Sequence, residues 1–277
     1  MKIDFRRLLS FLLLISFTGV SLAQISLAPT SLYIHSDTNI GTLYVSNNSE
    51  QSQEITVSLA FGYPGSDKAG NMMMLYEDSV AYEKYALNDW VRVFPRTFVI
   101  APGQQQTVRI QVRPKKGIAD GVYWTRVKVL SNPQTPEVEQ SISENVTTRI
   151  TFKFEQVIAA FYLNGKTTTG LLVKGIESVQ EDNKLALLTN VERTGNSPFI
   201  GSIKAELYDA GGNLVRQQET TTAIYFDAVR RIEMDSNGLP AGKYQAKIFF
   251  ETRRGDVAPT DLVQSEPLVA TASVTLK

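Results

Sequence analysis

The feature that most restricts the fold of this sequence is a two-residue alternation of apolar and polar side chains. The segment Thr107–Arg113 shows it most clearly, with apolar side chains at Val108, Ile110 and Val112. This period places one set of side chains on each face of a β-strand. Runs rich in β-branched and aromatic residues recur between turn residues, at 41–45, 54–61, 107–113 and 122–130. Only 78–88 is expected to hold a short helix, so the sequence predicts an all-β protein.

The length and the turns favour two immunoglobulin-like β-sandwich domains in tandem. Such domains contain ~100 residues each, and the chain has 277. The polar stretch Asn164–Gly170 follows a long apolar segment, so we place the boundary there, with domains at 24–163 and 164–277. Each domain has a tyrosine shortly after a glycine turn, Tyr123 and Tyr244. Both resemble the tyrosine corner of immunoglobulin-like sandwiches.

Residues 1–23 have the organisation of a signal peptide. The basic residues Lys2, Arg6 and Arg7 precede an apolar stretch at 8–20, and small residues before Gln24 form a cleavage site. An uncleaved membrane anchor is the alternative, but the apolar stretch is shorter than the ~20 residues that a spanning helix needs. No later stretch is long enough to span a bilayer. We therefore expect an exported, soluble protein with no membrane span after cleavage.

The composition excludes several kinds of site. The chain has no cysteine and a single histidine, His35, so it cannot build a disulfide framework or a metal site with several Cys or His ligands. Its 28 basic and 28 acidic residues balance, which argues against general nucleic-acid binding. The sequence contains no Gly-x-Ser-x-Gly elbow and no phosphate-binding glycine motif. We expect no enzymatic activity, no catalytic residue, no cofactor and no metal.

Two segments are candidates for partner binding. The stretch Gly62–Asp89 is a long connection with three successive methionines, Met72–Met74. It is either an adaptable contact surface or a loop folded back over the sandwich. The segment Asn145–Tyr162 is unusually long for a strand and follows a polar, proline-containing loop. It is either an edge that donates or accepts a partner strand or an ordinary last strand that crosses to the next domain.

Motifs in the first predicted domain resemble those of a known family. The most specific is Pro-x-x-Phe-x-x-x-Pro-Gly-x-x-Gln-x-x-Arg-Ile at Pro95–Ile110, with further matches at Ile25–Ile34, Leu43–Asn48 and Thr148–Phe152. Through these residues the sequence resembles PapD-like periplasmic pilus-assembly chaperones over 24–163. The likeness is looser over 164–277, where Asn196–Phe199 and a hairpin at Asp209 carry it.

The resemblance implies a site on the last strand of the first domain. In that family this strand lends alternating apolar side chains to an incomplete pilin. Carried over, the strand is Val146–Phe154 and the partner-binding residues are Arg149, Ile150, Phe152, Lys153 and Phe154. The family also anchors the subunit's C-terminal carboxylate with an Arg and a Lys, at the positions of Ser31 and Thr151 here. This cationic clamp is missing unless Arg149 or Lys153 replaces it, which indicates a divergent member.

These inferences lead to one hypothesis and its alternatives. We expect a periplasmic chaperone-like protein that stabilises a secreted pilin-like or surface subunit by β-strand complementation, with an outer-membrane usher as a further candidate partner. The first alternative is a structural or adhesive cell-envelope protein with no chaperone role, whose site would be Gly62–Asp89. A hydrolase, which would need an acid/base pair between the domains, ranks last.

Overall fold

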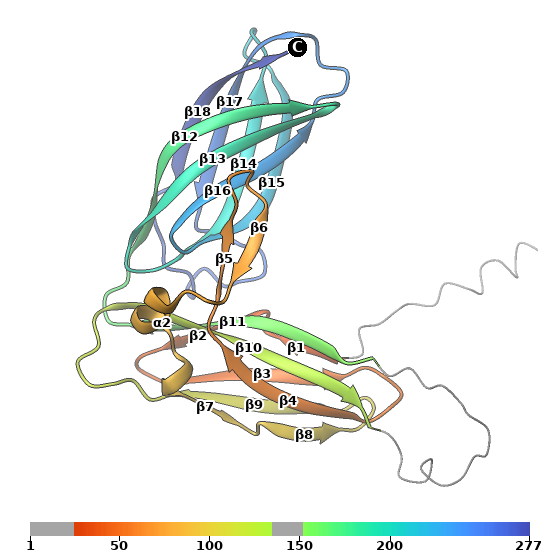
Figure 1. The fold of residues 1–277 in the computed structure, drawn as a ribbon, viewed down its shortest axis with the longest axis vertical. Coiled ribbons are helices and arrows are strands. Elements are labelled where there is room, and N and C mark those ends of the chain that lie inside the picture. The colour runs from red at the N-terminus through yellow and green to blue at the C-terminus, as the bar shows by residue number, and fades with distance from the viewer. Residues whose placement is uncertain (1–24, 135–151) are drawn as a thin grey trace, which may run out of the picture.

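The computed structural model describes residues 25–134 and 152–277, so the predicted signal peptide at 1–23 lies outside the described residues. The described chain forms two β-sandwiches, and the second stands on one end of the first (Figure 1). The predicted all-β fold with two tandem sandwiches is confirmed. Within the described ranges, no helix is long and apolar enough to cross a bilayer.

The first sandwich consists of a four-stranded and a five-stranded sheet. The four-stranded sheet has the order β1 (Ile25–Ala28), β3 (Ile40–Asn47), β9 (Gln105–Val112) and β7 (Val91–Phe94). The five-stranded sheet has the order β2 (Ser31–His35), β11 (Phe154–Asn164), β10 (Gly121–Pro133), β4 (Gln53–Ala60) and β8 (Thr97–Ile100). Neighbouring strands are antiparallel, except that β2 runs parallel to β11.

The second sandwich consists of a three-stranded and a four-stranded sheet. The three-stranded sheet has the order β12 (Thr169–Glu181), β13 (Lys184–Gly195) and β16 (Asp227–Asp235). The four-stranded sheet has the order β15 (Leu214–Ile224), β14 (Phe199–Tyr208), β17 (Gly242–Glu251) and β18 (Leu268–Leu276). The predicted boundary at Asn164–Gly170 falls where β11 ends and β12 begins.

The long connection Gly62–Asp89, here called the insert, has secondary structure of its own. It contains the hairpin β5 (Tyr63–Ser66) and β6 (Met72–Leu75) and the helix α2 (Ser79–Tyr85), and it ends in the 3-10 helix η1 (Asn88–Trp90). The expected short helix at 78–88 is therefore present as α2. In Figure 1 the hairpin rises from the first sandwich and lies alongside the second.

Local features of the fold follow the predictions. In β9 the alternating side chains Val108, Ile110 and Val112 are buried in the core of the first sandwich. The Tyr123 hydroxyl donates a hydrogen bond of 3.0 Å to the carbonyl of Ala119, and the Tyr244 hydroxyl one of 2.7 Å to the carbonyl of Pro240. Both tyrosines therefore reach a carbonyl four residues upstream, as a tyrosine corner does.

Candidate functional site

The strand β11 offers an incompletely paired edge. It pairs with β10 along its whole length, from Phe154 opposite Ser131 to Asn164 opposite Gly121. On its other side β2 pairs only with residues 159–163. Among the described residues, no strand covers that side of β11 from Phe154 to Ile158. Such an edge presents backbone donors and acceptors to which another chain can add a strand.

The hydrogen bonds of the parallel pair show which backbone groups face this edge. The carbonyl of Leu163 accepts a bond of 3.1 Å from the N–H of Ser36, so Leu163 turns its backbone groups towards β2. Successive residues in a strand alternate in this direction. Glu155 and Val157 are in phase with Leu163, and they therefore direct their N–H and C=O groups towards the uncovered edge.

Large apolar side chains gather at the same end of β11. Phe152 is 65% exposed, Phe154 46% and Val157 41%, and the rings of the two phenylalanines are 6.4 Å apart. Phe154 shares a strand face with Ile158, which belongs to the core of the first sandwich. Between them, the Gln156 amide donates a hydrogen bond of 2.6 Å to the carbonyl of Ile25 on the facing sheet. Phe154 thus continues the row of core side chains on this face beyond Gln156, and it is exposed to solvent.

The structure describes only some of the predicted site residues. Arg149 and Ile150 lie outside the described residues, as does most of the predicted strand Val146–Phe154. Phe152 and Lys153 are exposed and precede the strand, and Phe154 is the first residue of β11. The prediction of a strand through 152 and 153 is therefore wrong, because the ladder with β10 begins only at Phe154.

Of the two positions predicted for the cationic clamp, the structure describes only that of Ser31, and this residue carries no charge. Ser31 begins β2, and its partner in the parallel register is Ala159 of β11. Both residues are neutral. Thr151, the second predicted position, lies outside the described residues. Lys153 is exposed, and Arg149 lies outside the described residues, so compensation of the clamp by either one remains a prediction.

An aromatic cluster, which sequence reasoning missed, joins the two sandwiches. Trp124 of β10 lies 4.9 Å from the ring of Tyr225 and 4.7 Å from that of Tyr85. Tyr63 of the insert lies 5.8 Å from Tyr225 and 4.9 Å from Phe226. The aromatic dipeptide at 225–226 was a visible signal, but the sequence does not show which distant residues meet it.

Arg126 fixes one side of this cluster. Its Nε donates a hydrogen bond of 2.9 Å to the carbonyl of Gly62, and its Nη2 donates one of 3.1 Å to the hydroxyl of Tyr225. Burial raises the pKa of Tyr225, and the nearby guanidinium of Arg126 opposes that rise. A single side chain of β10 therefore bonds both the start of the insert and the second sandwich.

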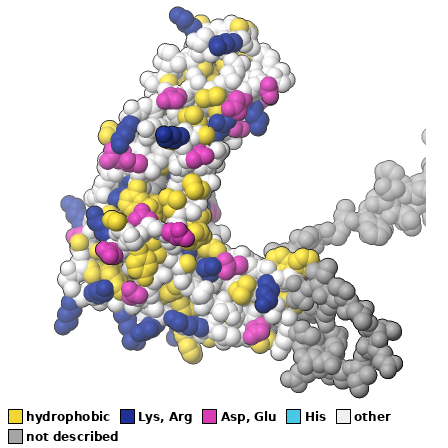
Figure 2. All heavy atoms as spheres, in the orientation of Figure 1, with side chains coloured by type: hydrophobic (Ala, Val, Ile, Leu, Met, Phe, Trp, Pro, Cys, Tyr) yellow, Lys and Arg dark blue, Asp and Glu magenta, His cyan; other side chains and the backbone are white. Residues whose placement is uncertain are grey.

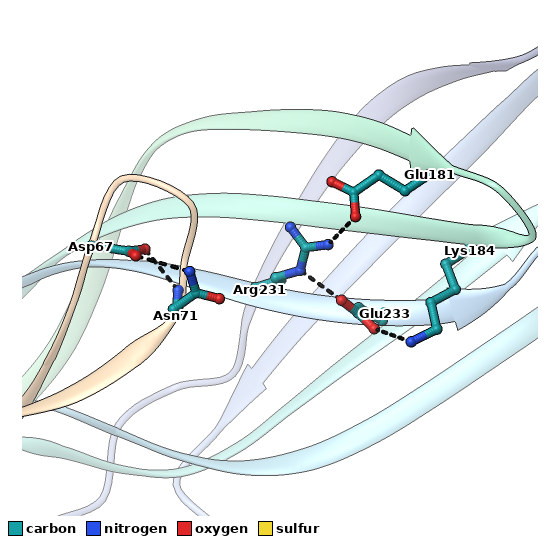
Figure 3. Close-up of polar contacts among 6 residues, drawn as sticks. All are labelled: Asp67, Asn71, Glu181, Lys184, Arg231 and Glu233. Atoms are coloured by element: carbon teal, nitrogen blue, oxygen red, sulfur yellow. Dashed lines mark hydrogen bonds and ion pairs between the residues drawn. The ribbon is translucent and has the colours of Figure 1, made fainter.

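The hairpin of the insert is seated on β16, an edge strand of the second sandwich. The Ser66 hydroxyl accepts a bond of 2.8 Å from the N–H of Val229. At the hairpin tip, Asp67 accepts bonds from the backbone and the side chain of Asn71 (Figure 3). Next to this tip lies Arg231, whose guanidinium bonds Glu233 at 2.7 Å and Glu181 at 3.3 Å. The insert therefore packs against the second sandwich as well as against its own.

The lone histidine lies in a surface contact. The His35 imidazole is 3.7 Å from the carboxylate of Asp261, and both side chains are well exposed. This geometry is that of a surface ion pair, which forms when the imidazole is protonated. Among the described residues, no group of three or more His, Cys, Asp or Glu side chains is placed to hold a metal ion.

No family model matches the chain. No curated protein matches it in sequence. Solved structures are similar to it over most of its length. The YadV chaperone is 14% identical, over 91% of this chain and 100% of that one, with a TM-score of 0.47. A complex of Salmonella enterica SafA pilin with the SafB chaperone gives 16% identity, 92% and 99% coverage and a TM-score of 0.44.

The Escherichia coli chaperone DraB is similar at 14% identity, over 91% of this chain and 98% of that one, with a TM-score of 0.39. The similar structures therefore include several chaperones, one of them in complex with a pilin. At these identities and TM-scores the likeness assigns no function to the chain or to its residues.

Proposed function

We propose that the chain is an exported, non-enzymatic chaperone of the periplasm that binds a secreted fimbrial or surface subunit. The observation that carries this proposal is the edge of β11, where backbone groups and apolar side chains are exposed together. A subunit strand pairs with the N–H and C=O groups of Glu155 and Val157. The phenylalanines at 152 and 154, together with Ile150, fill an apolar groove of the subunit.

The energetics of this mode are favourable. Complete burial of a phenylalanine side chain contributes about 1.5–3 kcal/mol, and Phe152 and Phe154 are largely exposed in the free chain. An aspartate at either position loses this contribution and also places a charge in an apolar groove. A loss of about 3 kcal/mol corresponds to a weakening of roughly 100-fold in affinity.

Capture of a subunit from a periplasmic extract tests the side-chain part of the proposal. Phe154→Asp, Phe152→Asp and Ile150→Asp should abolish co-purification of the native partner, identified by mass spectrometry, without impairing export. Val99→Asp is the matched control, because Val99 is 52% exposed on β8, the opposite edge strand of the same sheet. If the three variants retain every partner that the unchanged protein retains, the proposal fails.

The backbone part needs a separate variant. Val157→Pro removes an N–H that faces the uncovered edge, while the ladder between β11 and β10 does not use that group. We expect it to weaken capture, whereas Val157→Thr, which keeps the N–H, should bind normally. Partner capture that is equal for both variants would show that main-chain pairing at this edge is not used.

A further inference from the structure

A second uncovered strand edge lies on the insert. β6 pairs with β5 on one side, and no described strand pairs with its other side. The N–H of Asp67 bonds the carbonyl of Asn71 at 3.1 Å, so 67 and 71 form a hydrogen-bonded pair. Hydrogen-bonded pairs alternate with non-hydrogen-bonded pairs along an antiparallel hairpin, so Gly65 with Met73 and Tyr63 with Leu75 are also hydrogen-bonded pairs. Met72 and Met74 therefore direct their N–H and C=O groups away from β5, towards the open edge.

Apolar side chains surround this edge. Met72, Met73 and Met74 are 63%, 50% and 39% exposed, and Tyr76 and Val80 nearby are exposed as well. Methionine is flexible and polarisable, so it adapts to apolar partners of different shape. Figure 2 shows hydrophobic side chains gathered where the two sandwiches meet, with acidic side chains among them.

A negatively charged pocket of about 600 Å³ adjoins the edge, and Met74, Tyr76, Glu77 and Asp78 are among its lining residues. Asp78 accepts a bond of 2.9 Å from the N–H of Ala81 and another from the hydroxyl of Tyr63, so its carboxylate is already engaged. Glu77 forms no ion pair with any residue that the structure describes. The lining contains two carboxylates and no Lys or Arg side chain.

From the open edge, the methionines and this pocket, we infer that β6 binds an extended segment of a partner protein in which apolar residues flank a lysine or arginine. The segment adds as a strand to β6 through the N–H and C=O groups of Met72 and Met74. Its apolar side chains lie over the methionines, and its cationic side chain reaches Glu77 in the pocket. Charge complementarity selects a basic segment over an acidic one.

The hairpin is suited to such binding because it is held in place beforehand. The bond between Ser66 and Val229 and the close packing of Gly70 on Arg231 fix it to the second sandwich. An edge fixed in this way loses little conformational freedom when a partner binds. The site is separate from the edge of β11, whose N-terminal end lies at the far end of the first sandwich (Figure 1). The inference does not depend on the proposed function.

Two labelled hexapeptides test the inference on residues 24–277, the chain after the predicted signal peptide. We expect acetyl-Thr-Val-Lys-Val-Thr-Val-amide to bind, by fluorescence anisotropy, at least about tenfold more tightly than its counterpart with Glu in place of Lys. Glu77→Lys should reverse this preference. Met74→Pro, which removes an outward N–H, should weaken binding at least about tenfold, whereas Met74→Leu should not. In hydrogen exchange, the lysine peptide should protect the amides of Met72 and Met74.

The inference is overturned if the two peptides bind equally well, if Met74→Pro binds like Met74→Leu, or if the amides of Met72 and Met74 stay unprotected. Phe154→Asp distinguishes this site from the edge of β11. Unchanged peptide binding by that variant supports β6, whereas a loss confined to that variant assigns the peptide to β11 and refutes the inference.

Discussion

The hydroxyl of Ser66 accepts a hydrogen bond of 2.8 Å from the backbone N–H of Val229, which lies 163 residues further along the chain. Ser66 belongs to a hairpin inserted in the first sandwich, and Val229 belongs to an edge strand of the second. Together with the aromatic cluster around Trp124, this bond makes the insert a bridge between the sandwiches. The orientation of the two sandwiches therefore depends on a segment that neither of their sheets contains.

Ser66→Ala should destabilise the protein, because it leaves the N–H of Val229 without this acceptor. A hydrogen bond of this kind contributes about 1 kcal/mol, which corresponds to a fall of roughly 2–4 °C in melting temperature for a chain of this size. Ser46→Ala is the control, because among the described residues the Ser46 hydroxyl bonds only the exposed side chain of Gln105. Equal melting temperatures for the two variants would contradict the bridging role of Ser66.

Gly70→Ala should separate the hairpin tip from β16. Gly70 has a φ of +80°, and an added Cβ would lie 2.7 Å from the Cβ of Arg231 and 3.2 Å from its backbone N. Gly212 has the same φ with nothing within 4 Å of an added Cβ, so Gly212→Ala isolates the backbone cost of about 1 kcal/mol. Proteolysis should cut the hairpin faster in Gly70→Ala than in Gly212→Ala. Equal cleavage would show that the tip does not depend on this contact.

Asp78 should control the start of α2. Its carboxylate caps the helix by accepting from the N–H of Ala81, and this bond, followed by the one from the Tyr63 hydroxyl, holds the pKa of Asp78 below its ordinary value of 3.8. Asp78→Ala should cost about 1 kcal/mol, whereas Asp78→Asn keeps a capping oxygen and should cost less. Chemical unfolding monitored by circular dichroism measures both.

The same residue predicts a pH dependence. Because the pKa of Asp78 is lower in the folded chain than in the unfolded chain, its contribution to stability is present above about pH 4 and is lost as the pH falls through the folded value. Asp78→Asn should remove this part of the acid dependence. An identical acid profile for Asp78→Asn and the unchanged protein would rule out ionised Asp78 as its source.

Arg230 should weaken the second sandwich rather than support it. Its side chain is 4% exposed and shares the inward face of β16 with Ile232. Its Nη2 donates a hydrogen bond of 2.5 Å to the carbonyl of Ala223, but Nε and Nη1 have no hydrogen-bond partner among the described residues. Burial lowers the pKa of Arg230 to about 10. The folded state thus disfavours the charged form, and the penalty is complete below about pH 10 and declines as the pH rises through that value.

Arg230→Met should therefore stabilise the protein at pH 7 by about 1–3 kcal/mol, because it removes a buried polar group that is only partly hydrogen-bonded. Arg231→Met is the neighbouring control and should instead lose stability, because Arg231 pairs with Glu181 and Glu233. Urea unfolding of both variants measures the difference. A less stable Arg230→Met would show that the guanidinium is satisfied in solution.

Features set by nearby residues were predictable from the sequence. The alternation in β9 predicted its buried face at Val108, Ile110 and Val112, because side chains of a strand point to opposite faces in turn. The corners at Tyr123 and Tyr244 were predictable for a similar reason, since each hydroxyl reaches a carbonyl only four residues away. In the candidate site, Phe152 and Phe154 are exposed, and their role in partner binding stays a prediction.

The start of β11 was not predictable in the same way. The alternation runs through Phe152, but the described strand begins at Phe154, where the ladder with β10 starts. A period describes which residues share a face, whereas a strand also needs a neighbour to receive its hydrogen bonds. That β2 covers 159–163 and leaves 154–158 open is likewise a property of the assembled sheet.

The residue pattern alone was enough to predict an all-β chain in two sandwiches, and the composition leaves neither cysteines nor a second histidine for thiol or multi-histidine metal chemistry. That the insert bridges the sandwiches and leaves β6 open became visible in the folded molecule, because Tyr63 and Tyr225 meet across 162 positions of sequence. Periodicity and turn residues act over a few positions, so they define strands and corners. Contacts between distant segments depend instead on how the completed sheets pack, and no local pattern encodes that packing.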